Sequence, residues 1–225
     1  GASELTDGAD NDCDDEVDEG VYCNAYFPMS NGSTAARIYE TTPQNGTTYT
    51  ETVSIDVWDA ATMSGSLLRN YFDGTSTSFD VVEERSCVSG QFGITGWEMS
   101  RGAGLSATIT YTGGRIELLA ETDLVPGASW TYTYSASDSL GLVSYDASGT
   151  FEVIGTTTYS GPAGTFDALE VQNTYALVDT GTSDLIDIDV DREGVISTFY
   201  VERLGIVYVQ DRADDGTVVE TRELQ

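Results

Sequence analysis

The sequence contains no lysine and no histidine, and its nine basic residues are all arginine. Without histidine, no Ser-His-Asp or Cys-His triad can form, and the commonest general base is missing. Without lysine, Schiff-base catalysis is excluded. Two carboxylates could still hydrolyse a glycosidic bond, but no acid pair stands out for that chemistry. The composition therefore predicts a protein that is not an enzyme.

Positive charge is scarce along the whole chain. Thirty-eight Asp and Glu residues stand against nine Arg, which gives a formal net charge of -29. Binding to nucleic acid requires basic residues that neutralise phosphates, and an anionic membrane surface would repel so acidic a chain. We therefore expect no nucleic-acid partner and no anionic membrane surface as a partner, whereas cations such as calcium should be attracted.

The chain also lacks an apolar run of transmembrane length and a recognisable signal peptide. Its Asp-rich start and its Ser/Thr/Gly-rich remainder are typical of extracellular proteins, in which disulfides persist. We expect a secreted or cell-surface protein, with the periplasm as the alternative location.

Cysteine is also rare, with Cys13, Cys23 and Cys87 as the three examples. Because the number is odd, one thiol is left over or pairs between chains. A bridge between Cys23 and Cys87 would tie the start of the chain to its body, whereas a bridge between Cys13 and Cys23 would close the acidic segment. Both pairings stay open at the level of sequence.

Short segments rich in β-branched and aromatic residues follow one another through most of the chain. Residues 48–58 alternate apolar and polar side chains, which is typical of a half-buried strand. Similar segments span 77–84, 106–112, 115–121, 129–136, 149–159, 166–178, 194–210 and 217–224. Turn-forming pairs such as Gly113-Gly114 and Asp215-Gly216 separate them. No segment shows a long helical period, so we expect an all-β, strongly curved antiparallel meander.

Residues 7–20, DGADNDCDDEVDEG, concentrate negative charge in an alternating pattern. Ca²⁺ takes about six to eight oxygen ligands, and a short loop with acidic residues at alternate positions can wrap around it. The expected ligands are Asp10, Asp12, Asp14, the backbone carbonyl of Glu16, and Asp18, with Asp7 or Glu19 as the closing carboxylate. An EF-hand is not supported, because Asp15 stands where glycine is usual and Val21 where glutamate is usual. The alternative is a solvated acidic tail.

The same segment resembles a metal-binding motif of bacterial secreted proteins, the MopE-like type. In that motif the pattern reads Cys-Asp-Gly-x-Asp-Asn-Asp-Cys-Asp-Gly-x-x-Asp-Glu, and residues 7, 8, 10–14, 18 and 19 match it position for position. Thr6 replaces the first cysteine and Asp15 replaces the second glycine. The resemblance implies a bound metal ion, which agrees with the calcium interpretation of the spacing.

Four phrases in the rest of the chain carry a second resemblance. They are YFPMSNGSTAARIYE (26–40), VPGASWTYTYS (125–135), SGPAGTFDALEVQNTY (160–175) and STFYVERLGIVYVQDRADDGTVVETREL (197–224). In this order they resemble bacterial secreted or lipoprotein-like β half-barrels, related in shape to the lipoprotein-carrier (LolA/LolB-like) fold. The resemblance implies a curved sheet around a concave apolar surface that shields acyl chains. Ala36 and Arg203 depart from the family's pattern.

Aromatic residues on these strands are candidates for the concave apolar surface. Since aromatic residues on strands are often part of an ordinary core, that role is the alternative for each of them. The candidates are Trp58, Trp97, Trp130, Phe151, Phe166, Phe199 and Tyr200.

The composition changes near residue 24, and this change divides the chain into two parts. Residues 1–24 form an acidic calcium-binding arm, and residues 25–225 form an antiparallel, half-barrel-like β-domain. We expect a secreted, calcium-binding, non-catalytic structural or cell-surface protein. It could self-assemble into a homo-oligomer or filament through its arm or through open sheet edges. The alternative is a periplasmic or extracellular carrier of an apolar, lipid-like ligand in the concavity.

Overall fold

The computed structural model describes residues 24–27, 36–44, 46–59, 62, 64–72, 78–101, 105–141, 143–181 and 191–225. The expected calcium ligands between residues 7 and 19, together with Cys13 and Cys23, lie outside these residues. The calcium site, the disulfide pairing and the division of the chain at residue 24 therefore stay predictions.

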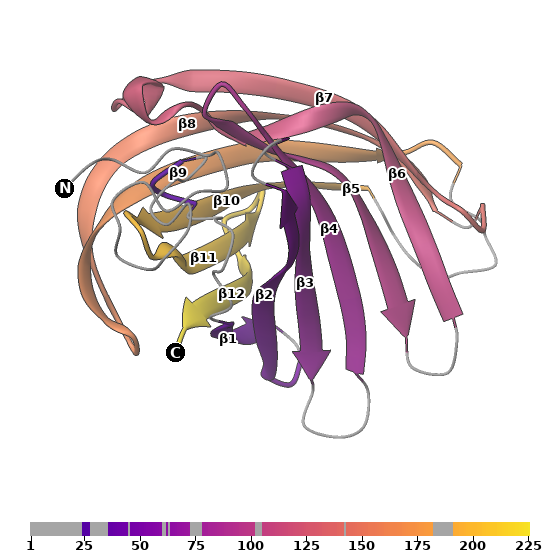
Figure 1. Cartoon of the computed structure of the whole chain (residues 1–225), viewed down its shortest axis with the longest axis horizontal. Coiled ribbons are helices and arrows are strands. Elements are labelled where there is room, and N and C mark those ends of the chain that lie inside the picture. Colours follow the sequence, from indigo (N-terminus) through magenta and orange to yellow (C-terminus); the bar gives the residue numbers. More distant parts are fainter. Residues whose placement is uncertain are drawn as a thin grey trace.

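Twelve antiparallel strands lie within the described residues and close into a single barrel (Figure 1). Consecutive strands are neighbours, and β1 completes the ring by pairing with β12. The strands are β1 (Arg37–Pro43), β2 (Tyr49–Asp59), β3 (Ser64–Phe72), β4 (Ser78–Val88), β5 (Gln91–Arg101), β6 (Leu105–Leu118), β7 (Ser129–Asp138), β8 (Ser144–Gly161), β9 (Gly164–Asp179), β10 (Arg192–Val201), β11 (Gly205–Ala213) and β12 (Val218–Leu224). The predicted all-β antiparallel meander is confirmed, but it forms a closed barrel and not a half-barrel.

Barrel closure leaves fewer open sheet edges than the expected half-barrel would have. Each described strand pairs with a neighbour on both sides, but some strands do so over only part of their length. The seam between β6 and β7 has four residue pairs, which run from Ile109 with Asp138 to Thr112 with Ser135. Residues 129–134 of β7 are not paired with β6, so self-assembly through sheet edges stays a prediction.

Helical structure in the described part of the chain is limited to one 3₁₀ turn, η1 (Glu121–Asp123). This agrees with the expectation of low helix content. None of the described segments forms a helix with the length and apolar character needed to cross a membrane.

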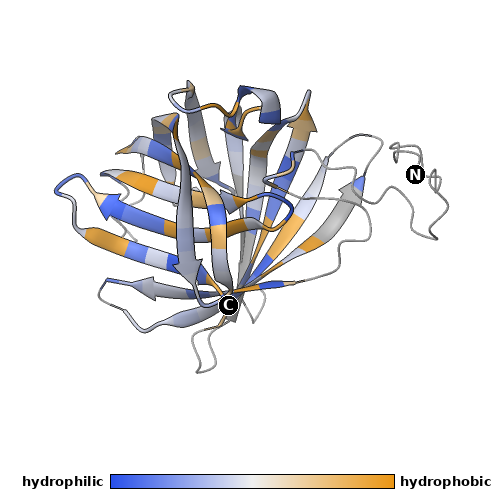
Figure 2. Ribbon diagram, turned by 90° about the vertical axis from the view of Figure 1, so that its left-hand side faces the viewer, coloured by the Kyte–Doolittle hydropathy of each residue, from blue (hydrophilic) through white to orange (hydrophobic). Residues whose placement is uncertain are grey.

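The alternation of side chains along each strand decides which residues face the interior. In β7, Tyr132, Tyr134 and Ala136 are buried, whereas the residues between them are exposed. Figure 2 shows the same alternation of hydrophobic and hydrophilic residues along several strands. Because successive side chains of a strand point to opposite faces, the interior receives every second residue.

The predicted turns have mixed outcomes. Asp215-Gly216 joins β11 to β12, and Gly216 has the positive φ of 83° that favours glycine there. Gly113-Gly114 is not a turn, because β6 runs through both residues. The strand continues because β5 pairs with β6 on both sides of the glycines, at Thr110 and at Arg115, and the extra residues 111–114 form a bulge in β6.

A short turn at residues 24–27 packs against the barrel. The Phe27 ring stacks on Phe92 of β5, with ring centroids 3.9 Å apart. The Asn24 side-chain amide donates a hydrogen bond of 2.7 Å to the backbone carbonyl of Leu119. Residues at the expected boundary between arm and domain therefore belong to the core of the barrel.

Candidate functional site

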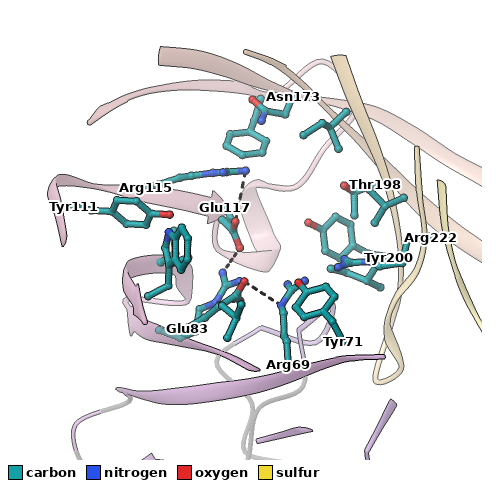
Figure 3. Close-up of a pocket in the computed structure, with 18 residues that line it drawn as sticks. Arg69, Tyr71, Glu83, Tyr111, Arg115, Glu117, Asn173, Thr198, Tyr200 and Arg222 are labelled. Atoms are coloured by element: carbon teal, nitrogen blue, oxygen red, sulfur yellow. Dashed lines mark hydrogen bonds and ion pairs between the residues drawn. The ribbon is translucent and has the colours of Figure 1, made fainter. Parts of the chain in front are cut away.

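The barrel holds a cavity of about 410 Å³ (Figure 3). Side chains from β3 to β6 and from β8 to β12 line it. Sites for small organic molecules typically have volumes of about 300–1,000 Å³. The cavity is therefore large enough for a small ligand, at the lower end of that range.

A continuous series of charged side chains runs along one wall of the barrel. We call it the arginine–glutamate ladder, and its members in order of contact are Arg222, Glu51, Arg69, Glu83, Arg85, Glu117 and Arg115. Positive and negative groups alternate along it. The ladder begins and ends with an arginine, so it contains four guanidiniums and three carboxylates.

The middle of the ladder is tightly paired. Arg69 Nη1 lies 2.8 Å from Glu51 Oε1, and Arg69 Nε lies 3.0 Å from Glu83 Oε1. Arg85 bridges Glu83 and Glu117 through hydrogen bonds to both carboxylates. Each of these two central arginines thus contacts two carboxylates, which is the arrangement that makes a buried charge tolerable.

The two ends of the ladder are more loosely paired. Arg222 Nη1 lies 3.3 Å from both oxygens of Glu51. Arg115 Nη2 lies 3.5 Å from Glu117 Oε1. The Nε atoms of Arg115 and Arg222, like that of the central Arg69, are buried and have no hydrogen-bond partner of good geometry within the described residues. The looser pairing of the terminal arginines therefore lies in their longer distances to a single carboxylate.

Strand register brings the members of the ladder together. Ile94 of β5 lies opposite Arg85 of β4 on one side and opposite Arg115 of β6 on the other. On the far side of the ladder, Arg222 of β12 lies opposite Thr41 of β1. Since β1 then pairs with β2, barrel closure brings Arg222 to Glu51, which is 171 residues away in the sequence.

The ladder shifts the pKa values of its carboxylates. Burial alone would raise the pKa of Glu83, but the guanidiniums of Arg69 and Arg85 outweigh it and lower that pKa to about 2. The pKa of Glu117 is also lowered, because Arg85 and Arg115 together outweigh the effect of burial. Both carboxylates are therefore ionised at neutral pH and remain counter-charges for the arginines.

The facing part of the cavity is mostly apolar and aromatic. Phe151 of β8 and Ile196 and Tyr200 of β10 are among the residues that line it. Burial raises the pKa of Tyr200, so its hydroxyl stays protonated and can donate a hydrogen bond. The side-chain oxygen of Asn173, on β9, is buried without a hydrogen-bond partner in the described part of the chain. The cavity thus has a charged side and an apolar side with few polar groups.

The structure places the predicted aromatic candidates in several environments. Trp97, Phe151 and Tyr200 line the cavity. Trp130 stacks on Phe151 with ring centroids 5.1 Å apart, and Phe166 packs against the core. Neither of these two is among the lining residues. The Trp58 side chain lies outside the described part of the structure.

Phe199 lies away from the cavity although its neighbour in sequence lines it. Phe199 and Tyr200 are consecutive on β10, so their side chains point to opposite faces of the strand. The Phe199 ring contacts Tyr159 and Tyr208, with ring centroids 5.9 Å and 5.5 Å apart.

Sequence reasoning missed the arginine–glutamate ladder. The available signal was that Arg115 and Arg222 lie in segments predicted as strands, in a chain that has only nine arginines. The pattern could not show that they face inward, because apolar residues occur on both faces of these strands. Leu67 and Leu68 of β3 are one such pair of consecutive apolar residues.

Among the described residues, no group of three or more Cys, Asp and Glu side chains is arranged to hold a metal ion. The expected calcium ligands lie outside those residues, so this finding does not test them. Cys87 is buried on β4 and is disulfide-bonded. Of the two expected pairings, the bridge between Cys23 and Cys87 is the one that includes Cys87, and it stays a prediction because Cys23 lies outside the described residues.

No protein-family model and no curated protein sequence matches the chain. Two solved structures share its fold. A protein from Bacteroides fragilis, described as an exported protein with a YmcC-like fold, aligns with a TM-score of 0.58 and 14% identity over 87% of this chain and 96% of its own. A protein from Parabacteroides distasonis, described as a lipoprotein, aligns with a TM-score of 0.58 and 14% identity over 90% of this chain and 97% of its own.

These likenesses agree with two expectations from the sequence. The body of the chain resembles exported and lipoprotein-type β proteins at the level of fold. The descriptions of both neighbours also correspond to the secreted, cell-surface or periplasmic location that the composition predicts. The MopE-like resemblance lies outside the described residues and stays a prediction.

Proposed function

We propose that the protein is an exported, non-catalytic binding protein that holds a small amphipathic molecule inside its barrel. The observation that carries this proposal is the two-sided cavity, with the arginine–glutamate ladder on one side and apolar and aromatic residues on the other. A molecule with one polar end and one apolar body would match both sides. This proposal develops the alternative drawn from the sequence, a carrier of an apolar ligand. It differs in that the ligand also has a polar group.

The pKa values of the carboxylates in the cavity favour binding over catalysis. A general acid is most effective when its pKa lies near the working pH. The pKa of Glu83 is instead lowered to about 2 and that of Glu117 is also lowered, because arginines surround both groups. Both carboxylates therefore stay ionised, so they are better suited to stabilise the buried arginines than to transfer protons.

The proposed location is outside the cytoplasm, either secreted, at the cell surface or in the periplasm. The acidic, Ser/Thr/Gly-rich composition supports this location, and the two structural neighbours are described as an exported protein and a lipoprotein. Calcium binding by the arm is a separate proposal, which rests on the spacing of acidic residues 10–18.

The proposal can be tested with N-phenyl-1-naphthylamine, an uncharged aromatic probe that fluoresces more strongly in apolar surroundings. We expect saturable binding of about one probe per barrel. Thr198 lines the cavity from β10, so a Thr198→Trp substitution should fill part of the space and weaken binding by about tenfold or more. The matched control is Ser197→Trp, since Ser197 is on the opposite face of the same strand and does not line the cavity.

Thermal unfolding of both variants would show that each is folded before binding is compared. If the wild-type protein shows no saturable binding, or if Thr198→Trp and Ser197→Trp bind the probe alike, the barrel interior is not a ligand site.

A further inference from the structure

The interior of the barrel differs in charge from the rest of the chain. Four of the nine arginines belong to the arginine–glutamate ladder, together with only three of the 38 acidic residues. Four positive and three negative groups leave the ladder with a charge of +1. The whole chain carries -29, so the remainder carries -30. A buried excess of positive charge carries a large desolvation cost unless an anionic partner compensates it.

The two terminal arginines, Arg115 and Arg222, each pair with one carboxylate among the described residues, and the pair of Arg115 has the longer distance. Arg69 and Arg85 each contact two carboxylates. Among the described residues, Arg115 forms an ion pair with Glu117 alone, at 3.5 Å, and the other oxygen of that carboxylate is already held by Arg85. A guanidinium has five N–H donors, and the buried Nε of Arg115 has no hydrogen-bond partner in this part of the chain.

Aromatic rings fix the position of the Arg115 guanidinium. Its central carbon lies 5.2 Å from the ring centroid of Tyr132 and 5.3 Å from that of Phe151. Contacts of this kind favour a cation over an aromatic face. Figure 3 shows the Arg115 side chain reaching into the cavity from one side while Tyr200 points into it from the other. The forked guanidinium of Arg115, held in place by the two rings, thus faces an apolar space that also contains the hydroxyl donor of Tyr200.

We infer that the ligand of the barrel is an amphipathic anion whose negatively charged head group binds Arg115 and whose apolar body lies against Phe151 and the side chains of β10. Carboxylate, sulfonate and phosphate-ester head groups share the required chemistry, because each accepts two parallel hydrogen bonds from a guanidinium. This inference rests on the proposed function and specifies its substrate class.

Two features argue against other ligand classes. A cation would meet a ladder with a charge of +1 and the weakly paired guanidinium of Arg115. A free inorganic anion would satisfy Arg115 but would leave the apolar side of the cavity in contact with water. Glu220, a further half-buried carboxylate on β12, is engaged by the Tyr49 hydroxyl at 3.4 Å and does not line the cavity.

The test compares two probes with the same aromatic skeleton. 8-Anilino-1-naphthalenesulfonate carries one sulfonate, and N-phenyl-1-naphthylamine carries none. Arg115→Met should weaken binding of the sulfonate about tenfold or more, because a charge-assisted hydrogen bond is lost. The same change should alter binding of the uncharged probe by less than about twofold. The fold should survive, since Glu117 keeps Arg85 as its partner.

Arg192→Met is the matched control. Arg192 also pairs with a carboxylate, Asp211, at 2.5 Å and lies 5.7 Å from the Tyr175 ring centroid, but it does not line the cavity. Both variants remove one positive charge from the protein, so a general electrostatic effect would appear in both. Arg115→Lys, which keeps the charge and loses the fork, should show a sulfonate affinity between those of the wild type and Arg115→Met.

Decanoate and acetate distinguish an amphipathic anion from a free one. Decanoate should displace the sulfonate probe, whereas acetate at the same concentration should not. Equal displacement by the two would show a site for small anions and would overturn the inference.

The two proposals fail in different ways. If the uncharged probe binds in the barrel but Arg115→Met leaves the sulfonate affinity unchanged, the head-group inference is wrong and the proposed function stands. If neither probe binds, the proposed function itself is wrong.

Discussion

Replacing Glu83 with glutamine should destabilise the barrel by about 3 kcal/mol. The Glu83 carboxylate lies between Arg69 and Arg85 and contacts both. Without this carboxylate, the buried guanidiniums of Arg69 and Arg85 would each lose one of their two counter-charges. Removing one partner of a buried ion pair costs about 3–5 kcal/mol. The fall in the pKa of Glu83 from its ordinary 4.5 to about 2 corresponds to about 3 kcal/mol at about 1.4 kcal/mol per pKa unit.

The measurement is urea unfolding at neutral pH, followed by tryptophan fluorescence and circular dichroism. For a protein of this size, a loss of about 3 kcal/mol should also lower the melting temperature by roughly 6–12 °C. The matched control is Glu84→Gln, because Glu84 is the next residue of β4 and is exposed. That variant should change the free energy of unfolding by less than about 0.5 kcal/mol. Similar small losses in both variants would refute the reasoning.

A double variant separates the loss of charge pairing from a general loss of packing. Adding Arg69→Met to Glu83→Gln removes one of the two guanidiniums that lost a partner, and every remaining charge of the ladder keeps a neighbour of opposite sign. Part of the lost stability should therefore return. A double variant whose loss equals the sum of the two single losses would show that the charges do not act as a connected series.

The contribution of Glu83 should depend on pH. Because its pKa is lower in the folded protein than in the unfolded chain, the contribution is complete above about pH 4.5 and is lost as the pH falls toward about 2. Urea unfolding at several pH values should show this acid-dependent loss in the wild type and a smaller one in Glu83→Gln; identical profiles would count against the assigned pairing. In the arm, Asp12→Ala should remove a calcium site in isothermal titration, since Asp12 is an expected ligand, and equal heats from variant and wild type would contradict the calcium prediction.

Much of the fold could be predicted from the period-two alternation of apolar and polar residues. The alternation identified most of the strands, including those that became β2, β7, β8 and β9. It missed β1, β3 and β5. In the latter two, residues 64–72 and 91–101 mix glycine, serine and charged residues with few β-branched ones. Their place in the barrel depends on pairing with strands on both sides, which overrides weak local preference.

The candidate site was predicted only in part. Trp97, Phe151 and Tyr200 were chosen from the sequence as aromatic residues on strands, and they line the cavity. Phe199 was chosen for the same reason, but it lies on the other face of β10 from Tyr200. Aromatic content alone does not separate the two faces of a strand when both carry large apolar side chains.

The sequence by itself determined the all-β antiparallel class, the acidic character of the chain and the absence of histidine and lysine chemistry, because these follow from composition and from spacing along a strand. Only the tertiary structure decided that the sheet closes, and that four arginines and three glutamates meet inside it. The physical reason is that barrel closure is set by the number, tilt and stagger of all strands together. Local sequence therefore cannot specify that Arg222 meets Glu51, which lies 171 residues away and joins it only after β1 pairs with both β12 and β2.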